Sequence, residues 1–426
     1  MLDLKYIRDN PEAVRKALRV KMLAESEPKL DQLLVTDEEL RILRRDLEGL
    51  QAERNASSKR VGELKRRGAD DPDLMAHLAT LSDDVKRLED RARSLQQLLD
   101  TLLLEMPNLP HPSVPYGESE HDNVVVKEWG ERPAFQFVPR PHWDILEEKG
   151  WVQLEAGVTL TGAGFPVFRG QGARLVRALQ TYFLDRVGDA GFEEIAPPLL
   201  VNATSATATG QLPDKEGQMY EVTGGLYLIP TSEVALTNLH RDEIVDDAAL
   251  PIRYAAFTAC FRREAGSHGK DVRGLNRVHQ FDKVEMVQFC APAASYDALE
   301  DMTRLAESLL EELGLPYRRL LMCTGDLGFT QAKKYDLEVW AAGQERWLEV
   351  SSISNLEAFQ ANRLKTRSRP GGIAGKGRPE SVHTLNGSAL AFPRTIAALI
   401  ENNQNADGSV TLPQVLAPYF GSTTLR

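Results

Sequence analysis

Two long segments of the chain carry mainly apolar positions at alternating steps of three and four residues. In the first segment these positions are Leu33, Thr36, Leu40, Leu43, Leu47, Leu50, Arg54, Ser57, Val61 and Leu64. In the second they are Leu74, Leu78, Leu81, Val85, Leu88, Ala92, Leu95, Leu99 and Leu102. This spacing places the side chains along one narrow seam of a helix. Because a narrow seam is buried by a single partner helix, the two segments are predicted to pair as a coiled coil.

A short polar segment separates the two seams. Its Gly68 can take a positive φ and end the first helix, while Asp71 can cap the second helix with Pro72 in the first turn. A connection this short forces an antiparallel hairpin, which we call the arm and place at about residues 30–104. Helices of roughly 33 residues, at 1.5 Å per residue, give the arm a length of about 50 Å. We expect it to project into solvent.

Proline positions divide the rest of the chain. Residues 1–30 are expected to form short helices, one of which starts at Asn10-Pro11. The Pro-rich stretch 107–115 indicates extended backbone. We therefore expect an N-terminal domain over residues 1–105, a Pro-rich linker over 106–130 and a second domain over 131–426.

The second domain has a different pattern from the arm. A helical stretch over residues 172–187 alternates with strand-like runs such as 225–229 and 283–289, and Gly, aromatic and β-branched residues become more frequent. This mixture predicts an α+β domain built on an antiparallel β-sheet flanked by helices.

Composition fits a soluble protein of two or three domains. Of the 426 residues, 42% are hydrophobic and 27% are charged. The first six residues carry charges where a signal peptide needs an apolar run, and no stretch approaches the roughly eighteen apolar residues of a transmembrane helix. We therefore expect a cytoplasmic protein without a membrane partner. Cys260, Cys290 and Cys323 are scattered, which argues against disulfides and against a zinc site.

The net charge of −11 argues against nucleic-acid binding unless basic residues are concentrated locally. Such a concentration occurs near the predicted tip of the arm, where Glu63 is the nearby acid. The candidate RNA-binding residues there are Arg54, Lys59, Arg60, Lys65, Arg66 and Arg67. From these residues alone, a hairpin used only for oligomerisation, or an ordinary solvated surface, remains an alternative interpretation.

The segment 261–281 carries the most informative chemistry. Arg262 can brace a phosphate and its transition-state charge, and Glu264, two residues later on the same predicted strand face, can accept from an exocyclic amine. A loop with Gly266, Gly269 and Gly274 follows, and Phe281 can stack under a purine. A β-hairpin with surface ion pairs would carry an Arg-x-Glu pair as well, but it does not need the full combination.

This segment resembles motif 2 of the class II aminoacyl-tRNA synthetases. The stretch from Gly191 to Pro198 looks like motif 1, with a proline at a dimer interface, and the stretch from Gly387 to Thr395 looks like motif 3. P-loop and dinucleotide-binding glycine patterns are absent from the sequence, so ATP must be bound in another way.

Within that class, nearly the whole chain resembles the seryl-tRNA synthetases of bacterial type. The resemblance includes the opening Met1 to Arg8, the arm, Gly210 to Pro213, Pro230 to Glu233, Glu349 to Ser352 and Asn386 to Ser388. The chain departs from many relatives at Ala391-Phe392-Pro393, where they carry Val-Gly before the arginine, but Arg394 is retained.

The resemblance implies a serine–tRNA ligase. Such an enzyme activates L-serine with ATP to seryl-adenylate and transfers the seryl group to the 3′ end of serine tRNA, and activity on selenocysteine tRNA is left open. It further implies a homodimer, Mg²⁺ as a cofactor, no zinc and no DNA partner. The arm would read the long variable arm of serine tRNAs through shape and backbone.

The resemblance also implies residue roles. The catalytic residues would be Arg262, Glu264 and Arg394. Serine would be held by Thr231, Ser232, Glu233, Arg262, Glu285, Thr384 and Ser388. ATP would be held by Arg262, Arg263, Glu264, Val278, Phe281, Glu349, Val350, Ser351, Ser352 and Arg394. Glu349 and Ser352 would be the Mg²⁺ ligands.

Three other interpretations make different predictions. A synthetase paralogue that charges a carrier protein would lack the arm. A non-enzymatic coiled-coil scaffold would have lost residues such as Arg262, Glu349 and Arg394. A synthetase of the archaeal zinc type would need a metal-binding Cys or His set near the serine site.

Overall fold

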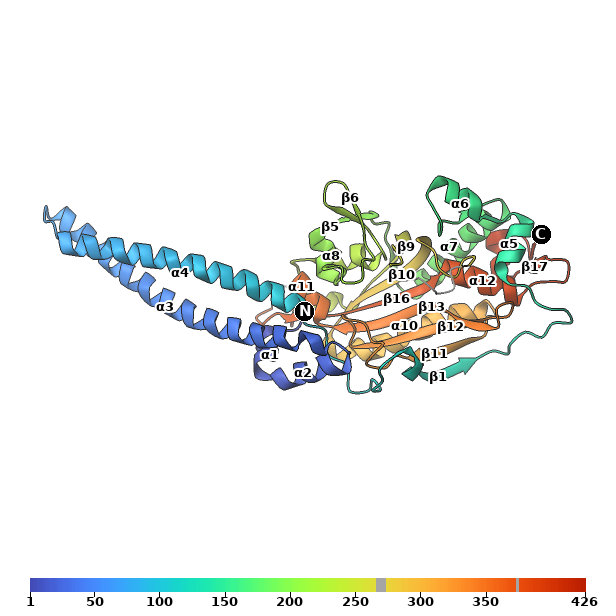
Figure 1. The fold of residues 1–426 in the computed structure, drawn as a ribbon, viewed down its shortest axis with the longest axis horizontal. Helices are drawn as coiled ribbons and strands as arrows, with labels where there is room; N and C mark the ends of the chain where they lie inside the picture. Colours follow the sequence, from blue (N-terminus) through green and yellow to red (C-terminus); the bar gives the residue numbers. More distant parts are fainter. Residues whose placement is uncertain (266–272, 373–374) are drawn as a thin grey trace. The chain divides into compact units, whose positions relative to one another are not determined.

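The computed structural model describes residues 1–265, 273–372 and 375–426 (Figure 1). Gly266 and Gly269 of the expected glycine loop lie outside the described residues. The chain divides into two compact units, Met1–Pro107 and Asn108–Arg426. The domain limits predicted from the sequence stay a prediction. Within the expected linker 106–130, residues Val124–Trp129 form strand β1, which pairs with β11 of the second unit.

The arm is a pair of antiparallel helices, as the seams predict. Helix α3 spans Glu27–Arg66 and helix α4 spans Pro72–Leu104, and the two run side by side (Figure 1). Arg44 Nη2 donates to Gln96 Oε1 over 2.7 Å, and Gln51 Nε2 donates to Glu89 Oε1 over 2.9 Å. Residue numbers therefore rise on one helix as they fall on the other. Every seam position is buried or half-buried.

The predicted turn chemistry at the tip of the arm is confirmed. Helix α3 ends before Gly68, whose φ is +70°, and the Asp71 carboxylate accepts from the Leu74 backbone N–H over 3.0 Å. Short helices α1 (Leu4–Asp9) and α2 (Pro11–Val20) precede the arm. Helix α2 does start at Pro11, but its Asn10 makes no side-chain capping bond, since Asn10 Nδ2 donates to the Tyr6 carbonyl instead.

The basic residues of the tip are accessible. Lys59, Arg60, Lys65, Arg66 and Arg67 are exposed, whereas Arg54 is half-buried on the seam. All six lie in the described part of the arm, and none of them makes an ion pair there.

The second unit is built on an eight-stranded sheet in the order β1-β11-β12-β13-β16-β10-β9-β4. Neighbouring strands are antiparallel except β4 and β9, which are parallel. The strands, in this order, span Val124–Trp129, Tyr317–Leu321, Lys333–Ala341, Arg346–Glu357, His383–Ala391, Gln280–Cys290, Ile252–Phe261 and Glu193–Glu194. The predicted antiparallel sheet is therefore present.

The second unit also contains helices, several of which pack against this sheet, and smaller sheets (Figure 1). The helices are α5 (His142–Lys149), α6 (Leu154–Leu160), α7 (Gln171–Asp189), α8 (Ala203–Thr209), α9 (Glu233–Thr237), α10 (Ser295–Glu312), α11 (Phe359–Leu364), α12 (Phe392–Asn402) and α13 (Ala417–Phe420). The short strands are β2 (Val152–Gln153), β3 (Val167–Phe168), β5 (Leu200–Asn202), β6 (Tyr220–Val222), β7 (Leu226–Leu228), β8 (Ile244–Asp246), β14 (Arg367–Arg369), β15 (Glu380–Ser381), β17 (Val410–Thr411) and β18 (Thr424–Leu425).

The main core of this unit lies on one face of the sheet. Helices α7, α10 and α12 contribute Tyr182, Leu299 and Ile396 to it, and strand β10 contributes Val284 and Met286. Side chains alternate along a strand, so the residues of β10 between these two and before them point to the opposite face. That opposite face carries the polar site described next. Among the described residues, no helix is both long and apolar enough to cross a bilayer.

Candidate active site

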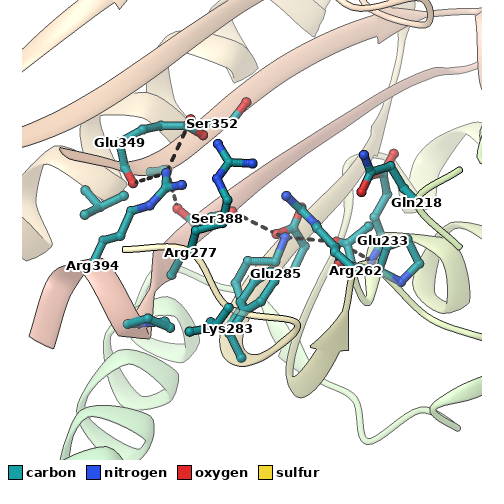
Figure 2. A pocket seen from close by; sticks show the side chains of 18 of the residues that line it. Gln218, Glu233, Arg262, Arg277, Lys283, Glu285, Glu349, Ser352, Ser388 and Arg394 are labelled. Atoms are coloured by element: carbon teal, nitrogen blue, oxygen red, sulfur yellow. Dashed lines mark hydrogen bonds and ion pairs between the residues drawn. The ribbon is translucent and has the colours of Figure 1, made fainter. Parts of the chain in front are cut away.

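A cavity of about 550 Å³ lies over the polar face of the sheet (Figure 2). Its size falls within the range of small-molecule sites. Strands β10, β13 and β16 form its floor, and the start of α12 closes one end. The residues proposed from the sequence that line it are Thr231, Glu233, Arg262, Glu264, Val278, Phe281, Glu285, Glu349, Val350, Ser351, Ser352, Ser388 and Arg394.

Three of the proposed residues do not line the cavity. Ser232 is fully buried. Thr384 is also fully buried, and its hydroxyl donates to Gln360 Oε1 over 2.9 Å. The Arg263 side chain is exposed, and its backbone N–H donates to the Gln218 carbonyl over 2.9 Å.

The cavity also contains residues that sequence reasoning did not assign. They include Gln211, Glu216, Gln218, Asn276, Arg277, Lys283, Gln331, Lys334 and Asn386. Lys283 could have been found, because it lies two residues before Glu285 on a predicted strand and so shares its face. Gln211 to Gln218 come from a segment without regular structure, and no periodic pattern marks them.

One end of the cavity holds a buried ion pair. Lys283 and Glu285 are 5% and 3% exposed, and the Lys283 ammonium pairs with Glu285 Oε2. The same ammonium donates to the Thr231 hydroxyl over 2.9 Å, and the Ser388 hydroxyl donates to Glu285 Oε2 over 3.1 Å. The Lys283 ammonium and the Ser388 hydroxyl thus converge on the Glu285 carboxylate, and Thr231 holds the ammonium, in a nearly dry site where such contacts are strong (Figure 2).

Glu233 is a second carboxylate at this end. Burial raises its pKa to about 7, and the neighbouring negative charge of Glu285 adds to the rise. Gln360 Nε2 donates to Glu233 Oε1 over 2.6 Å. This bond favours the charged form of Glu233, but it lowers the pKa by less than burial raises it. The Thr384 hydroxyl holds Gln360 in turn, so Thr384 reaches the site through Gln360 and Glu233.

The other end of the cavity is organised around Arg394 on the first turn of α12. Its Nε donates to the Asn276 carbonyl over 2.8 Å, and its Nη1 donates to the Glu349 carbonyl over 3.0 Å. The same Nη1 lies 3.6 Å from Glu349 Oε2 (Figure 2). These contacts aim the guanidinium into the cavity beside strand β13.

Glu349 and Ser352 on β13 both present oxygen atoms to the cavity. The side chain of Glu349 is 46% exposed, and its partial enclosure by protein acts to raise its pKa. The positive charges of Arg394 and Lys334 have a larger effect in the opposite direction, so the pKa of Glu349 lies below its ordinary value. Asp336 lies behind them on β12, with its Oδ2 3.2 Å from Lys334 Nζ. Burial raises the pKa of Asp336 to about 7, and Glu349 adds to that rise.

The middle of the cavity shows one departure from the expected geometry. Strand β9 ends at Phe261, and Glu264 has a φ of +48°, so Arg262 and Glu264 do not share a strand face. Glu264 instead forms an ion pair with Arg277. The Arg262 guanidinium lies 5.2 Å from the centre of the Phe281 ring. Both side chains still line the cavity, because the chain turns after β9 and returns in β10.

Comparison with known proteins gives matches over the whole chain. Residues 1–110 match the model of the seryl-tRNA synthetase N-terminal domain, and residues 220–403 match the model of the class II tRNA synthetase core domain (G, H, P, S and T). The chain is 51% identical to the serine–tRNA ligase of Salinibacter ruber over 99% of its own length and 98% of the relative's. It is 48% identical to the serine–tRNA ligase of Bacillus subtilis, with 99% of both chains covered.

A solved structure is similar over the same length. The seryl-tRNA synthetase of Pyrococcus horikoshii, crystallised with ATP, is 36% identical and superimposes with a TM-score of 0.93. The superposition covers 100% of this chain and 99% of that one.

Proposed function

Since this chain belongs to the seryl-tRNA synthetase family, we propose that its cavity binds L-serine at the Glu285 end and ATP toward Arg394. The family assignment makes the chain a serine–tRNA ligase, which activates serine with ATP and transfers the seryl group to tRNA. The observation that carries the proposal is the small, polar and buried cluster of Thr231, Lys283, Glu285 and Ser388.

Serine presents an ammonium, a carboxylate and a hydroxyl, and the cluster offers a partner for each. Glu285 and Glu233 supply carboxylates for the ammonium and the hydroxyl, and Thr231 and Ser388 supply further hydroxyl groups. The positive charges of Arg262 and Lys283 lie close enough to this end to attract the serine carboxylate. A site built to bond a hydroxyl rejects the analogue that lacks it, here alanine, by about 10⁴-fold.

The first reaction step forms a bond between a serine carboxylate oxygen and the α-phosphorus of ATP. The bond from the α-phosphorus to the bridging oxygen of the leaving group breaks, and pyrophosphate departs with its electron pair. Arg262 stabilises the charge that develops on the α-phosphate, and Arg394 binds the far end of the triphosphate. In the second step a hydroxyl of the terminal adenosine of tRNA attacks the seryl carbonyl, and AMP leaves.

Adenine would lie between Glu264 and Phe281. Phe281 offers a ring for stacking, and Glu264 offers a carboxylate for the exocyclic amine. In the free protein that carboxylate is paired with Arg277, so nucleotide binding would exchange one partner for another. Arg277 would then be released toward the phosphates.

Glu349 and Ser352 would hold Mg²⁺. Two protein oxygens beside a triphosphate suit this ion, which usually takes one or two carboxylates and completes its coordination with phosphate oxygens and water. The bound ion would neutralise phosphate charge.

The arm would bind serine tRNA through its exposed basic tip, and the chain would act as a homodimer. Lys59, Arg60 and Lys65 are exposed and hold no ion pair within the described arm, so they are available to phosphates. The stretch from Gly191 to Pro198, which follows α7 and contains β4, resembles motif 1 and supports a dimer interface there. Serine tRNA is the substrate proposed here, and selenocysteine tRNA is a second candidate for the same arm.

The test of the serine site is Glu285→Gln, which removes the charge and keeps the shape. We expect the KM for serine in serine-dependent pyrophosphate exchange to rise at least about tenfold, because the ammonium loses a buried charged partner. The KM for ATP should stay within about twofold. An unchanged KM for serine together with an unchanged kcat would contradict the assignment. Exposed Glu131→Gln is the matched control and should change neither constant.

A further inference from the structure

Behind the cavity lies a fully buried histidine and carboxylate pair that the proposed mechanism does not use. His142, the first residue of α5, and Glu401, near the end of α12, are both 0% exposed. His142 Nδ1 lies 2.7 Å from Glu401 Oε1, and helices α5 and α12 pack together (Figure 1). Placing two titratable side chains out of water is costly unless both are fully hydrogen-bonded.

The hydrogen bonds of this pair are complete and they fix the histidine tautomer. The Leu275 backbone N–H donates to His142 Nε2 over 2.8 Å, so Nε2 is the acceptor and the ring proton sits on Nδ1. Nδ1–H then donates to Glu401 Oε1. Glu401 Oε2 accepts from the backbone N–H groups of Gly343 and Gln344 over 2.9 and 3.1 Å.

Hydrogen bonds connect the pair to the proposed catalytic cavity. The residue after Leu275 is Asn276, whose carbonyl accepts from Arg394 Nε over 2.8 Å. The Asn276 side chain is held as well, because its Nδ2 donates to Gln344 Oε1 over 2.7 Å. Gln344 in turn donates from Nε2 to Glu401 Oε1 over 2.7 Å. Both of these hydrogen-bonded routes from Glu401 to Arg394 therefore run through Leu275-Asn276.

Glycine at position 274 shows how closely the backbone approaches His142. A Cβ atom at Gly274 would lie 2.3 Å from His142 Nε2, and the φ of Gly274 is +61°. A side chain there would collide with the ring, and an L-residue would also be strained. The imidazole of His142 therefore lies directly against the backbone at Gly274 and Leu275.

We propose that His142 is a positioning residue for Arg394. Held in one tautomer by Glu401, it accepts from the Leu275 N–H and so fixes the Asn276 carbonyl that orients the Arg394 guanidinium toward the triphosphate. This inference rests on the proposed role of Arg394 in binding ATP. It concerns a residue that is outside the cavity and touches no substrate.

Two substitutions of His142 distinguish the positioning of Arg394 from a purely structural role of the histidine. In His142→Gln the amide oxygen reaches the place of Nε2, so the acceptor for Leu275 is kept and the bond to Glu401 is lost. In His142→Asn the amide nitrogen takes the place of Nδ1, so the bond to Glu401 is kept and the acceptor for Leu275 is lost. We expect H142N to raise the KM for ATP in pyrophosphate exchange at least about fivefold, as for loss of one buried hydrogen bond. H142Q should stay within about twofold of wild type.

The serine KM is the internal control. It should change less than about twofold in both variants, because the Glu285 cluster shares no hydrogen bond with His142. If H142Q raises the KM for ATP more than H142N does, ATP binding depends on the pairing with Glu401 and not on the contact with Leu275, and the proposal is wrong. Equal effects of the two variants would overturn the proposal as well.

A double-mutant cycle tests the route through Arg394. In an Arg394→Lys background, H142N should cause no further rise in the ATP KM, since the group that His142 positions is gone. Additive effects would contradict the proposal. If R394K alone leaves the ATP KM unchanged, the proposed role of Arg394 fails. If R394K raises it and H142N does not, only the role of His142 fails.

Gln344→Ala gives a second variant if H142N does not fold. It keeps the contact between His142 and Glu401, and it removes both the side-chain anchor of Asn276 and the bond from Gln344 Nε2 to Glu401 Oε1. We expect a rise of about threefold in the ATP KM with the serine KM unchanged, as for one partly exposed hydrogen bond. An unchanged ATP KM in folded Q344A would overturn the proposed positioning of Asn276.

Discussion

At the scale of single residues, the serine end of the cavity places two carboxylates close together in a buried site. Lys283 is paired with Glu285, and Glu233 is left with a neutral partner, Gln360. The pKa of Glu233 is therefore raised to about 7, first by burial and then by the charge of Glu285. A Glu233 carboxyl with this pKa is partly protonated near neutral pH, which suits a partner for a hydroxyl.

The raised pKa of Glu233 predicts that the stability of the protein depends on pH. Because the pKa of Glu233 is about 7 in the folded state and 4.5 in the reference state, the folded protein holds a proton between these values that the unfolded chain has lost. The wild type therefore loses stability as pH rises through this window, by at most about 3 kcal/mol. Glu233→Gln cannot titrate, so its Tm relative to wild type should increase from pH 5 to pH 8.

Thermal melts of both proteins across that pH range provide the measurement. Exposed Glu155→Gln is the control and should track wild type at every pH. A constant difference in Tm between E233Q and wild type would mean that Glu233 is charged throughout.

Sequence reasoning finds about half of the residues that line the cavity, because their motifs are contiguous. It assigns no role to Lys283, because the sequence does not show that Thr231, from a distant segment, lies 2.9 Å from the Lys283 ammonium. It misjudges the path of the chain at Glu264, because an alternating pattern does not reveal that β9 ends at Phe261. It places Thr384 in the cavity, whereas that side chain acts through Gln360.

At the scale of elements, the arm is the part that local sequence determines best. Its seam, its turn and its capping residue are all contained in neighbouring residues, and the structure has each of them. The sheet is different. The pairing of β1 with β11, and the order of the eight strands, join segments nearly two hundred residues apart, and no periodic pattern encodes those contacts.

Adjacent leucines on α4 test the seam. Leu99 is 1% exposed and Leu98 is 37% exposed. Leu99→Ala should lower the free energy of unfolding of the arm by about 2–5 kcal/mol, because it leaves a cavity between the helices. Leu98→Ala, the matched control, should cost less than about 1 kcal/mol. Circular dichroism melts at 222 nm of both variants measure this, and equal effects would contradict the assigned seam.

At the scale of the whole molecule, the proposed function divides the work between two units. We propose that adenylate formation belongs to the unit Asn108–Arg426 and that tRNA recognition needs the arm. A net charge of −11 does not oppose RNA binding, because Lys59, Arg60 and Lys65 form a local basic surface at the tip.

Neutralising that surface should weaken tRNA charging selectively. The variant Lys59→Gln, Arg60→Gln, Lys65→Gln should raise the KM for tRNA and reduce its dependence on log[salt] by about one unit for each lost phosphate contact. A matched triple variant on α4, Lys86→Gln, Arg87→Gln, Arg93→Gln, should change the tRNA KM less, because Arg87 and Arg93 already pair with aspartates. Equal effects of the two variants would place the RNA contact elsewhere.

Shortening the arm tests the central claim most directly. Gln51 and Glu89 face each other across the two helices, so residues 52–88 can be replaced by a short Gly-Ser turn without touching the buried base at Leu30, Leu33 and Leu40. The measurement compares serine-dependent pyrophosphate exchange with seryl-tRNA formation in the shortened enzyme. We predict that exchange stays within about twofold of wild type while kcat/KM for tRNA falls at least about a hundredfold, as for loss of several phosphate contacts. Loss of both activities in parallel, or retention of both, would contradict a division of labour between the cavity and the arm.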